Sequence, residues 1–232
     1  MKNCKSLLLM LCLSILSLSI GAQNRQLARP AKTPSGETIF RAVFFAEGAL
    51  AKKIPQINGL QIGNFVKDPA QLRKVQKLRT AMIQYIRKSQ PAFFGQFKKQ
   101  MLSKNPAQVK RGLTYGSQMY KKALAAVSKV RPNTQLEGKI RGMMAQSGNK
   151  ALTGSQIAAE LRKPAMQRSI RSQSIKGDGG SQSGIVVDVH CVIAVCQVIL
   201  YVMNPLDYLS TNQSRLYTEQ ITLNFTKIEF RY

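Results

Sequence analysis

Residues 68–88 have the sequence DPAQLRKVQKLRTAMIQYIRK, and this stretch defines the fold of the larger part of the chain. Asp68 and Pro69 are typical of a helix start, because aspartate caps the first free backbone amides and proline fits the first turn. On a wheel of 3.6 residues per turn, one side is apolar (Leu72, Val75, Leu78, Met82, Ile83, Tyr85 and Ile86) and the other is basic (Arg73, Lys74, Lys77, Arg87 and Lys88). Arg79 interrupts the apolar stripe. The stretch predicts an amphipathic helix that packs on a core.

A second helix start lies at Asn105-Pro106. It precedes an apolar face made of Val109, Leu113, Met119, Tyr120, Ala123, Leu124, Val127 and Val130, opposite Lys110, Arg111, Lys121, Lys122 and Lys129. Further helices are expected over residues 91–104, which carry Phe93, Phe94 and Phe97, and over 137–144 and 155–163. The section 23–176 is therefore predicted to be a basic, mainly helical domain.

Charge divides the chain after Lys176. Residues 23–176 contain 30 Lys and Arg against five acids, a net charge of +25, whereas residues 177–232 contain three basic residues against five acids, a net charge of −2. The junction, residues 177–184, has the sequence GDGGSQSG, which is typical of a flexible linker that a protease can reach. The excess of positive charge predicts attraction to anionic surfaces such as acidic lipid headgroups or cell-wall polymers.

The section 185–232 differs in composition from the helical section. Residues 185–203 are dense in Val and Ile, and Ile221, Leu223 and Phe225 alternate with Thr222, Asn224 and Thr226. Both features favour β-strands. We expect residues 185–203 to pair with 216–232 in a small antiparallel hairpin or sheet, so that the predicted fold class is α+β.

The first 22 residues are typical of a secretory signal peptide. Lys2 and Lys5 precede an apolar run over residues 6–20, and small residues follow, so cleavage is expected between Ala22 and Gln23. The alternative is an uncleaved membrane anchor, although the run is shorter than the roughly 20 residues that span a bilayer. The chain is expected to be secreted, with the periplasm as the other possible location.

Two cysteines, Cys191 and Cys196, remain beyond the cleavage site, and a pair in an oxidising compartment is a candidate disulfide. In a helix, residues five apart have Cα atoms about 8.6 Å apart, and in a strand they are about 16 Å apart. Both exceed the reach of a disulfide. Either residues 192–195 form a loop and the cysteines are bonded, or a regular strand leaves two free thiols.

Enzymatic, metal-binding and nucleic-acid-binding roles are disfavoured. His190 is the single histidine of the chain and lies next to Cys191, and neighbours on a strand point to opposite faces. No sequence motif of a metalloprotease, serine hydrolase or P-loop is present. We therefore expect no catalytic residue, no cofactor and no metal. The basic composition would suit nucleic acid, but the export signal and the absence of tryptophan argue against it.

Residues 36–55, with the sequence GETIFRAVFFAEGALAKKIP, carry a resemblance to a known family. They are similar to the opening block of the sporulation-delaying protein C family of antimicrobial peptide precursors, in which a Gly-Glu pair, a Phe-rich stretch and a glycine precede an apolar and basic end. The matching residues are Gly36, Glu37, Phe40, Phe44, Phe45 and Gly48. The signal peptide, the basic helical middle and the close cysteine pair near the C-terminus also match the family.

The resemblance implies a secreted precursor from which a protease cuts a short hydrophobic peptide, with a membrane-bound immunity protein in the producer. The bacteriocin-like toxin would lie within about residues 178–232, bridged by Cys191 and Cys196, and would act on the membranes of competing bacteria. The alternative is a secreted or periplasmic basic protein that binds anionic cell-envelope surfaces without toxin activity.

Overall fold

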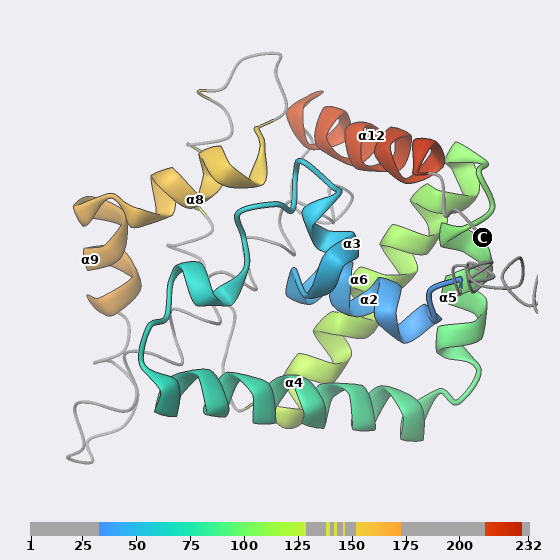
Figure 1. The fold of residues 1–232 in the computed structure, drawn as a ribbon, viewed down its shortest axis with the longest axis horizontal. Coiled ribbons are helices and arrows are strands. Elements are labelled where there is room, and N and C mark those ends of the chain that lie inside the picture. Colours follow the sequence, from blue (N-terminus) through green and yellow to red (C-terminus); the bar gives the residue numbers. More distant parts are fainter. Residues whose placement is uncertain are drawn as a thin grey trace, which may run out of the picture. The chain divides into compact units, whose positions relative to one another are not determined.

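The computed structural model describes residues 33–128, 152–172 and 212–228, together with residues 138, 139, 142 and 146. These residues contain eight α-helices, one 3-10 helix and no β-strand (Figure 1). In chain order the elements are α2 (Gly36–Phe45), α3 (Gly48–Lys52), η1 (Ile62–Asn64), α4 (Pro69–Ser89), α5 (Phe93–Met101), α6 (Pro106–Val127), α8 (Gly154–Arg162), α9 (Pro164–Ser172) and α12 (Asn212–Lys227). Their principal contacts join α4, α5, α6 and α2, and α12 lies against α6.

The two helices predicted from an Asx-Pro start are confirmed. The carboxylate of Asp68 accepts a hydrogen bond from the backbone amide of Ala70, at 2.9 Å, and α4 begins at Pro69. The side chain of Asn105 caps α6 in the same way, through the amide of Ala107 at 2.9 Å. Both caps satisfy amides that have no partner inside the helix, so the local sequence sets where the two longest described helices begin.

Two shorter helices also match the sequence. Helix α5 lies within the predicted range 91–104, and α8 begins one residue before the predicted range 155–163. Thr153 and Gln156 form a reciprocal capping box at the start of α8. Of the range 137–144, the structure describes residues 138, 139 and 142, which are helical.

Phenylalanine side chains from α2 and α5 form the centre of the core. The ring of Phe40 lies 4.7 Å from Phe44 and between 5.6 and 5.8 Å from four further rings, measured between centroids. These four are Phe45, Phe93, Phe94 and Phe97. Most of the pairs meet edge to face, the arrangement that aromatic quadrupoles favour. Helix α2 is thus buried on most of its circumference.

Close approach between α6 and the aromatic cluster depends on Gly116. A Cβ atom at this position would lie 2.6 Å from Cε2 of Phe44 and 2.8 Å from Cε2 of Phe97, closer than carbon atoms pack. Glycine weakens the interior of a helix by about 1 kcal/mol relative to alanine. Its presence in the middle of α6 is explained by the two rings that occupy the space of its missing side chain.

The predicted C-terminal sheet is wrong for the residues that the structure describes. Residues 212–227, which include most of the predicted strand 216–232, form helix α12. Ile221 and Phe225 are fully or almost fully buried, whereas Leu223 is 43% exposed. Residues 185–203, the other predicted strand, lie outside the described residues. The described part of the chain is all-α, which corrects the predicted α+β class.

None of the described helices combines the length and the apolar character that a membrane span requires.

Candidate functional site

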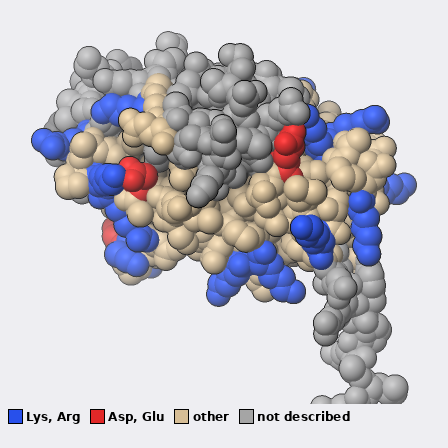
Figure 2. Space-filling view, turned by 90° about the horizontal axis from the view of Figure 1, so that it is seen from above, with Lys and Arg blue, Asp and Glu red and all other residues tan. Residues whose placement is uncertain are grey.

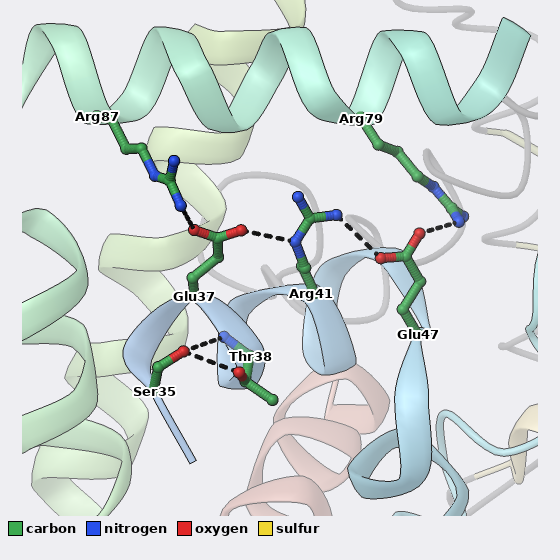
Figure 3. A network of polar contacts seen from close by, with 7 residues as sticks. All are labelled: Ser35, Glu37, Thr38, Arg41, Glu47, Arg79 and Arg87. Carbon is green, nitrogen blue, oxygen red and sulfur yellow. Dashed lines mark hydrogen bonds and ion pairs between the residues drawn. The ribbon is translucent and has the colours of Figure 1, made fainter.

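The block of residues that carries the family resemblance supplies three members of a network of five charged side chains, hereafter the ion-pair network. Its members are Glu37, Arg41, Glu47, Arg79 and Arg87 (Figure 3). Glu37 and Arg41 lie one turn apart on α2, and Glu47 precedes α3. Arg79 and Arg87 project from α4 toward them. The network therefore connects the first described helices to α4.

The two carboxylates alternate with the guanidinium groups along the network. Oε1 of Glu37 accepts a hydrogen bond from Nε of Arg41 at 2.9 Å, and Oε2 accepts one from Arg87 at 2.5 Å. Arg41 also donates to Oε2 of Glu47 at 3.2 Å, and Arg79 donates to Oε1 of Glu47 at 2.6 Å. Every carboxylate oxygen of the network thus accepts a charge-assisted hydrogen bond.

Arg79 is the most buried member, with 3% of its side chain exposed. Besides Glu47 it donates to the backbone carbonyl of Phe45, at 2.9 Å, and its guanidinium lies 5.3 Å from the centre of the Phe45 ring. The carbonyl, the carboxylate and the ring face all favour a cation. The residue that interrupts the apolar stripe of α4 is therefore accommodated by the end of α2 and by Glu47.

The pKa values of the α2 pair reflect this arrangement. Burial acts to raise the pKa of the Glu37 carboxyl, but hydrogen bonds and positive charges from Arg41 and Arg87 outweigh it, so the pKa lies below its ordinary value. Burial likewise acts to lower the pKa of Arg41, and its hydrogen bonds to Glu37 and Glu47 outweigh burial and raise it. Both groups are held in their charged forms.

The remaining residues of the resemblance shape the backbone around the network. Ser35 caps α2 by accepting a hydrogen bond from the amide of Thr38 (Figure 3). A Cβ atom on Gly36 would meet the carbonyl oxygen of Phe94 at 1.8 Å, so only glycine fits there. Gly48, the first residue of α3, has a φ of 82°, a backbone conformation that favours glycine. Phe40, Phe44 and Phe45 belong to the aromatic core.

A groove of about 780 Å³ lies beside the network. It is lined by the cations Arg41, Arg73 and Arg79 and by one carboxylate, Glu47, together with Ile62 and Leu72 among its apolar residues. Within the described part of the chain, no group of three or more His, Cys, Asp or Glu is placed to hold a metal ion. The chemistry available at this site is ion pairing and hydrogen bonding, which fixes α2 against α4.

Outside the network, the described surface is dominated by cations. Residues 33–128 contain 17 Lys and Arg and three acids, a net charge of +14. Two of the acids belong to the network, and the third, Asp68, caps α4. Figure 2 shows Lys and Arg side chains at several separate places on the visible face, and Asp and Glu at fewer. Such a surface attracts anionic partners.

The structure places the predicted site residues in two groups. It brings Gly36, Glu37, Phe40, Phe44, Phe45 and Gly48 together in and around α2, as described above. Ala22, Gln23, Cys191 and Cys196 lie outside the described residues. Sequence reasoning missed the role of Arg79 and Glu47 as partners, although the interruption of the apolar stripe by Arg79 was a signal of a buried ion pair.

Comparison with known protein families gives a match that includes this block of residues. The model of the family described as "sporulation delaying protein family toxin" matches residues 31–228. Neither the curated proteins nor the solved structures gave a match. The family match includes the ion-pair network, the aromatic core and α12, and covers most of the 232 residues. The chain belongs to the sporulation delaying protein family of toxins.

Proposed function

We propose that this chain is an exported precursor of a bacteriocin-like peptide, and that the peptide acts on the membranes of competing bacteria. Membership of a toxin family is the observation that carries the proposal. The division of the sequence supports it, because a basic helical section precedes a slightly acidic segment rich in Val and Ile. In this proposal residues 23–176 serve as a carrier, and the N-terminal 22 residues direct export.

Helix α12 narrows the part of the chain that the peptide would come from. Its buried residues Ile221 and Phe225 belong to the same hydrophobic cluster as α2, α5 and α6. A segment that contributes to the core of the carrier is a poor candidate for release. We therefore place the candidate toxin between α9 and α12, in residues 173–211, which contain Cys191 and Cys196 as its proposed bridge.

The basic surface supplies a reason for binding to an anionic target. Each Lys or Arg close to an anionic membrane contributes about 1 kcal/mol of attraction. In the proposed mechanism the carrier concentrates the precursor at anionic lipid or cell-wall polymers, and the processing protease then cuts near residues 177–184. A membrane-bound immunity protein protects the producer. No catalytic residue, cofactor or nucleic acid takes part.

The proposal is tested by the masses of the secreted products. The full-length gene is expressed in a secreting bacterial host, and intact masses of the culture supernatant are recorded with and without reductant. A fragment that begins between about residues 177 and 190, ends before Asn212, gains two hydrogen masses on reduction and collapses the membrane potential of indicator bacteria is the expected result. A single, non-toxic species that runs from Gln23 to Tyr232 would contradict the proposal.

A second function is favoured by the same surface charge. The net charge of +14 over residues 33–128 would suit an intact protein that binds anionic polymers of the cell envelope. This alternative predicts retention on purified cell walls, no toxicity and no cut near residue 180. The supernatant masses therefore distinguish the two functions before any toxicity assay.

A further inference from the structure

One face of α12 is buried, and its residues have the spacing of a helix that binds in a groove. Thr218, Ile221, Thr222 and Phe225 are all at most 5% exposed. These positions follow the pattern i, i+3, i+4, i+7 and therefore share one side of the helix. Leu223 lies off this stripe and is 43% exposed. The contact is thus made by one face of an amphipathic helix.

The surface that receives this face is built from segments far away in the sequence. Helix α12 contacts α6, and Figure 1 shows the two helices next to one another. Nδ2 of Asn224 donates a hydrogen bond of 2.6 Å to Oε1 of Gln56, 168 residues earlier in the chain. Apolar burial supplies affinity and the amide pair fixes the register, as in other complexes between a helix and a groove. We call this surface, which includes α6 and Gln56, the α12 groove.

We propose that the α12 groove holds residues 212–228 as a separate peptide after the chain is cut between α9 and α12. The inference concerns the cut precursor and in this sense rests on the proposed function, but the binding itself does not depend on toxicity. The α12 groove is expected to recognise a helix in which Ile and Phe lie four residues apart with an asparagine between them. After processing, the carrier and α12 would form a two-chain complex.

The number of residues between α9 and α12 explains why the α12 groove itself must supply most of the binding of α12. The sequence places 39 residues, 173–211, between α9 and α12, so the chain connection alone does not fix where α12 binds. A 16-residue helix is marginally stable alone in water, so α12 gains its helical form from the packing. A helix that is separated from α9 by so many residues therefore depends on its own contacts to stay bound.

The test uses the mature chain with a site-specific protease sequence placed immediately before Asn212. After complete cleavage under native conditions, the expected result is that the peptide 212–232 elutes with the body of the protein in gel filtration. The peptide should also exchange with an added, fluorescently labelled copy, which gives a dissociation constant by anisotropy. A peptide that separates from the body at micromolar concentrations would overturn the proposal.

Two substitutions on the same helix form a matched pair. Phe225→Ala removes a large side chain that is 2% exposed, and is expected to weaken binding of the peptide by about a hundredfold or more. Leu223→Ala removes an exposed side chain and is expected to leave the dissociation constant nearly unchanged. Because both are introduced into the labelled peptide, folding of the body is not affected. Equal losses of affinity in the two variant peptides would show non-specific adhesion and overturn the proposal.

A third variant should act in the opposite direction. The hydroxyl of Thr222 is buried and has no hydrogen-bond partner among the residues that the structure describes. Thr222→Val keeps the shape of the side chain and removes a polar group that is costly to bury. The valine peptide should bind several-fold more tightly than the parent peptide. Weaker binding of this variant would contradict the packing described here.

Discussion

At the scale of single residues, the guanidinium of Arg79 shows how the fold accommodates a charge inside its core. The side chain is 3% exposed, and its neighbours are a carboxylate, a backbone carbonyl and an aromatic ring face. Removal of one partner from a buried ion pair is costly because the other charge then stays in the protein interior without compensation. Glu47 is therefore expected to matter more for stability than an ordinary surface acid.

Replacement of Glu47 by glutamine tests this expectation. Glu47→Gln should lower the free energy of unfolding by about 3 kcal/mol, or somewhat less because the Glu47 side chain is 22% exposed. The matched control is Glu160→Gln, which breaks the exposed pair with Lys163 and should cost less than about 1 kcal/mol. Urea unfolding monitored by circular dichroism measures both. Equal losses of unfolding free energy in the two variants would show that the burial of Arg79 is unimportant.

Gly116 leads to a second prediction at this scale. Gly116→Ala should destabilise the protein by about 1–3 kcal/mol, because the added carbon collides with the rings of Phe44 and Phe97. Gly95→Ala, in the first turn of α5 with open space around it, should instead raise stability by up to about 1 kcal/mol. Thermal unfolding of the two variants measures the difference. A stabilising effect of Gly116→Ala would contradict the described contact between α6 and α2.

At the scale of elements, the attachment of α2 to α4 should depend on pH through Glu37. The pKa of this carboxyl is lower in the folded protein than its unfolded value of about 4.3, because Arg41 and Arg87 contribute positive charge and hydrogen bonds. The unfolded chain therefore binds more protons in acid. The stability contributed by Glu37 is present above the unfolded pKa and is lost as the pH falls through the folded pKa.

Glu37→Gln removes this titration. As the pH falls below the unfolded pKa of about 4.3, the parent protein should lose stability, and the variant should lose less over the same interval while being less stable at neutral pH. Urea unfolding at several pH values gives both slopes. If the two proteins showed the same slope, Glu37 would not be coupled to Arg41 and Arg87 in solution.

The helices of this fold differ in how far the sequence alone predicts them. Helices α4 and α6 have local start signals and a wide apolar stripe, so their type and first residues follow from short-range rules. Helix α12 lacks these signals. Its residues 221–226 alternate as in a strand, yet Ile221 and Phe225 also lie one helical turn apart, and contacts with α6 and Gln56 favour the helix. Tertiary packing overrides local preference in such cases.

The candidate site was predictable as a block of sequence but not as a set of contacts. Glu37 belongs to the block that resembles the family, and Arg79 stood out within an apolar stripe. No short-range rule connects Arg79 to Glu47, which lies 32 residues earlier. The pairing results from the way α4 crosses α2, and helix periodicity does not contain that information.

At the scale of the whole molecule, charge is the dominant property. The net charge of +25 makes the folded chain repel itself, and its described acids are too few to neutralise the surface. Salt screens such repulsion over about 10 Å at 0.1 M. The melting temperature should therefore rise as sodium chloride is raised from about 0.01 M to about 0.5 M. Differential scanning calorimetry measures this, and a falling melting temperature would mean that the ion-pair network outweighs the repulsion.

The hydrogen bond between Asn224 and Gln56 has a consequence for the order of folding. The two residues are separated by 168 positions, so the contact forms only after nearly the whole described chain is available. A growing chain leaves the ribosome from its N-terminus, and contacts of long sequence separation form late. Helices α2 to α6 can assemble first, and the apolar surface that α12 covers stays exposed until α12 binds. Completion of the core therefore requires that synthesis has passed residue 225.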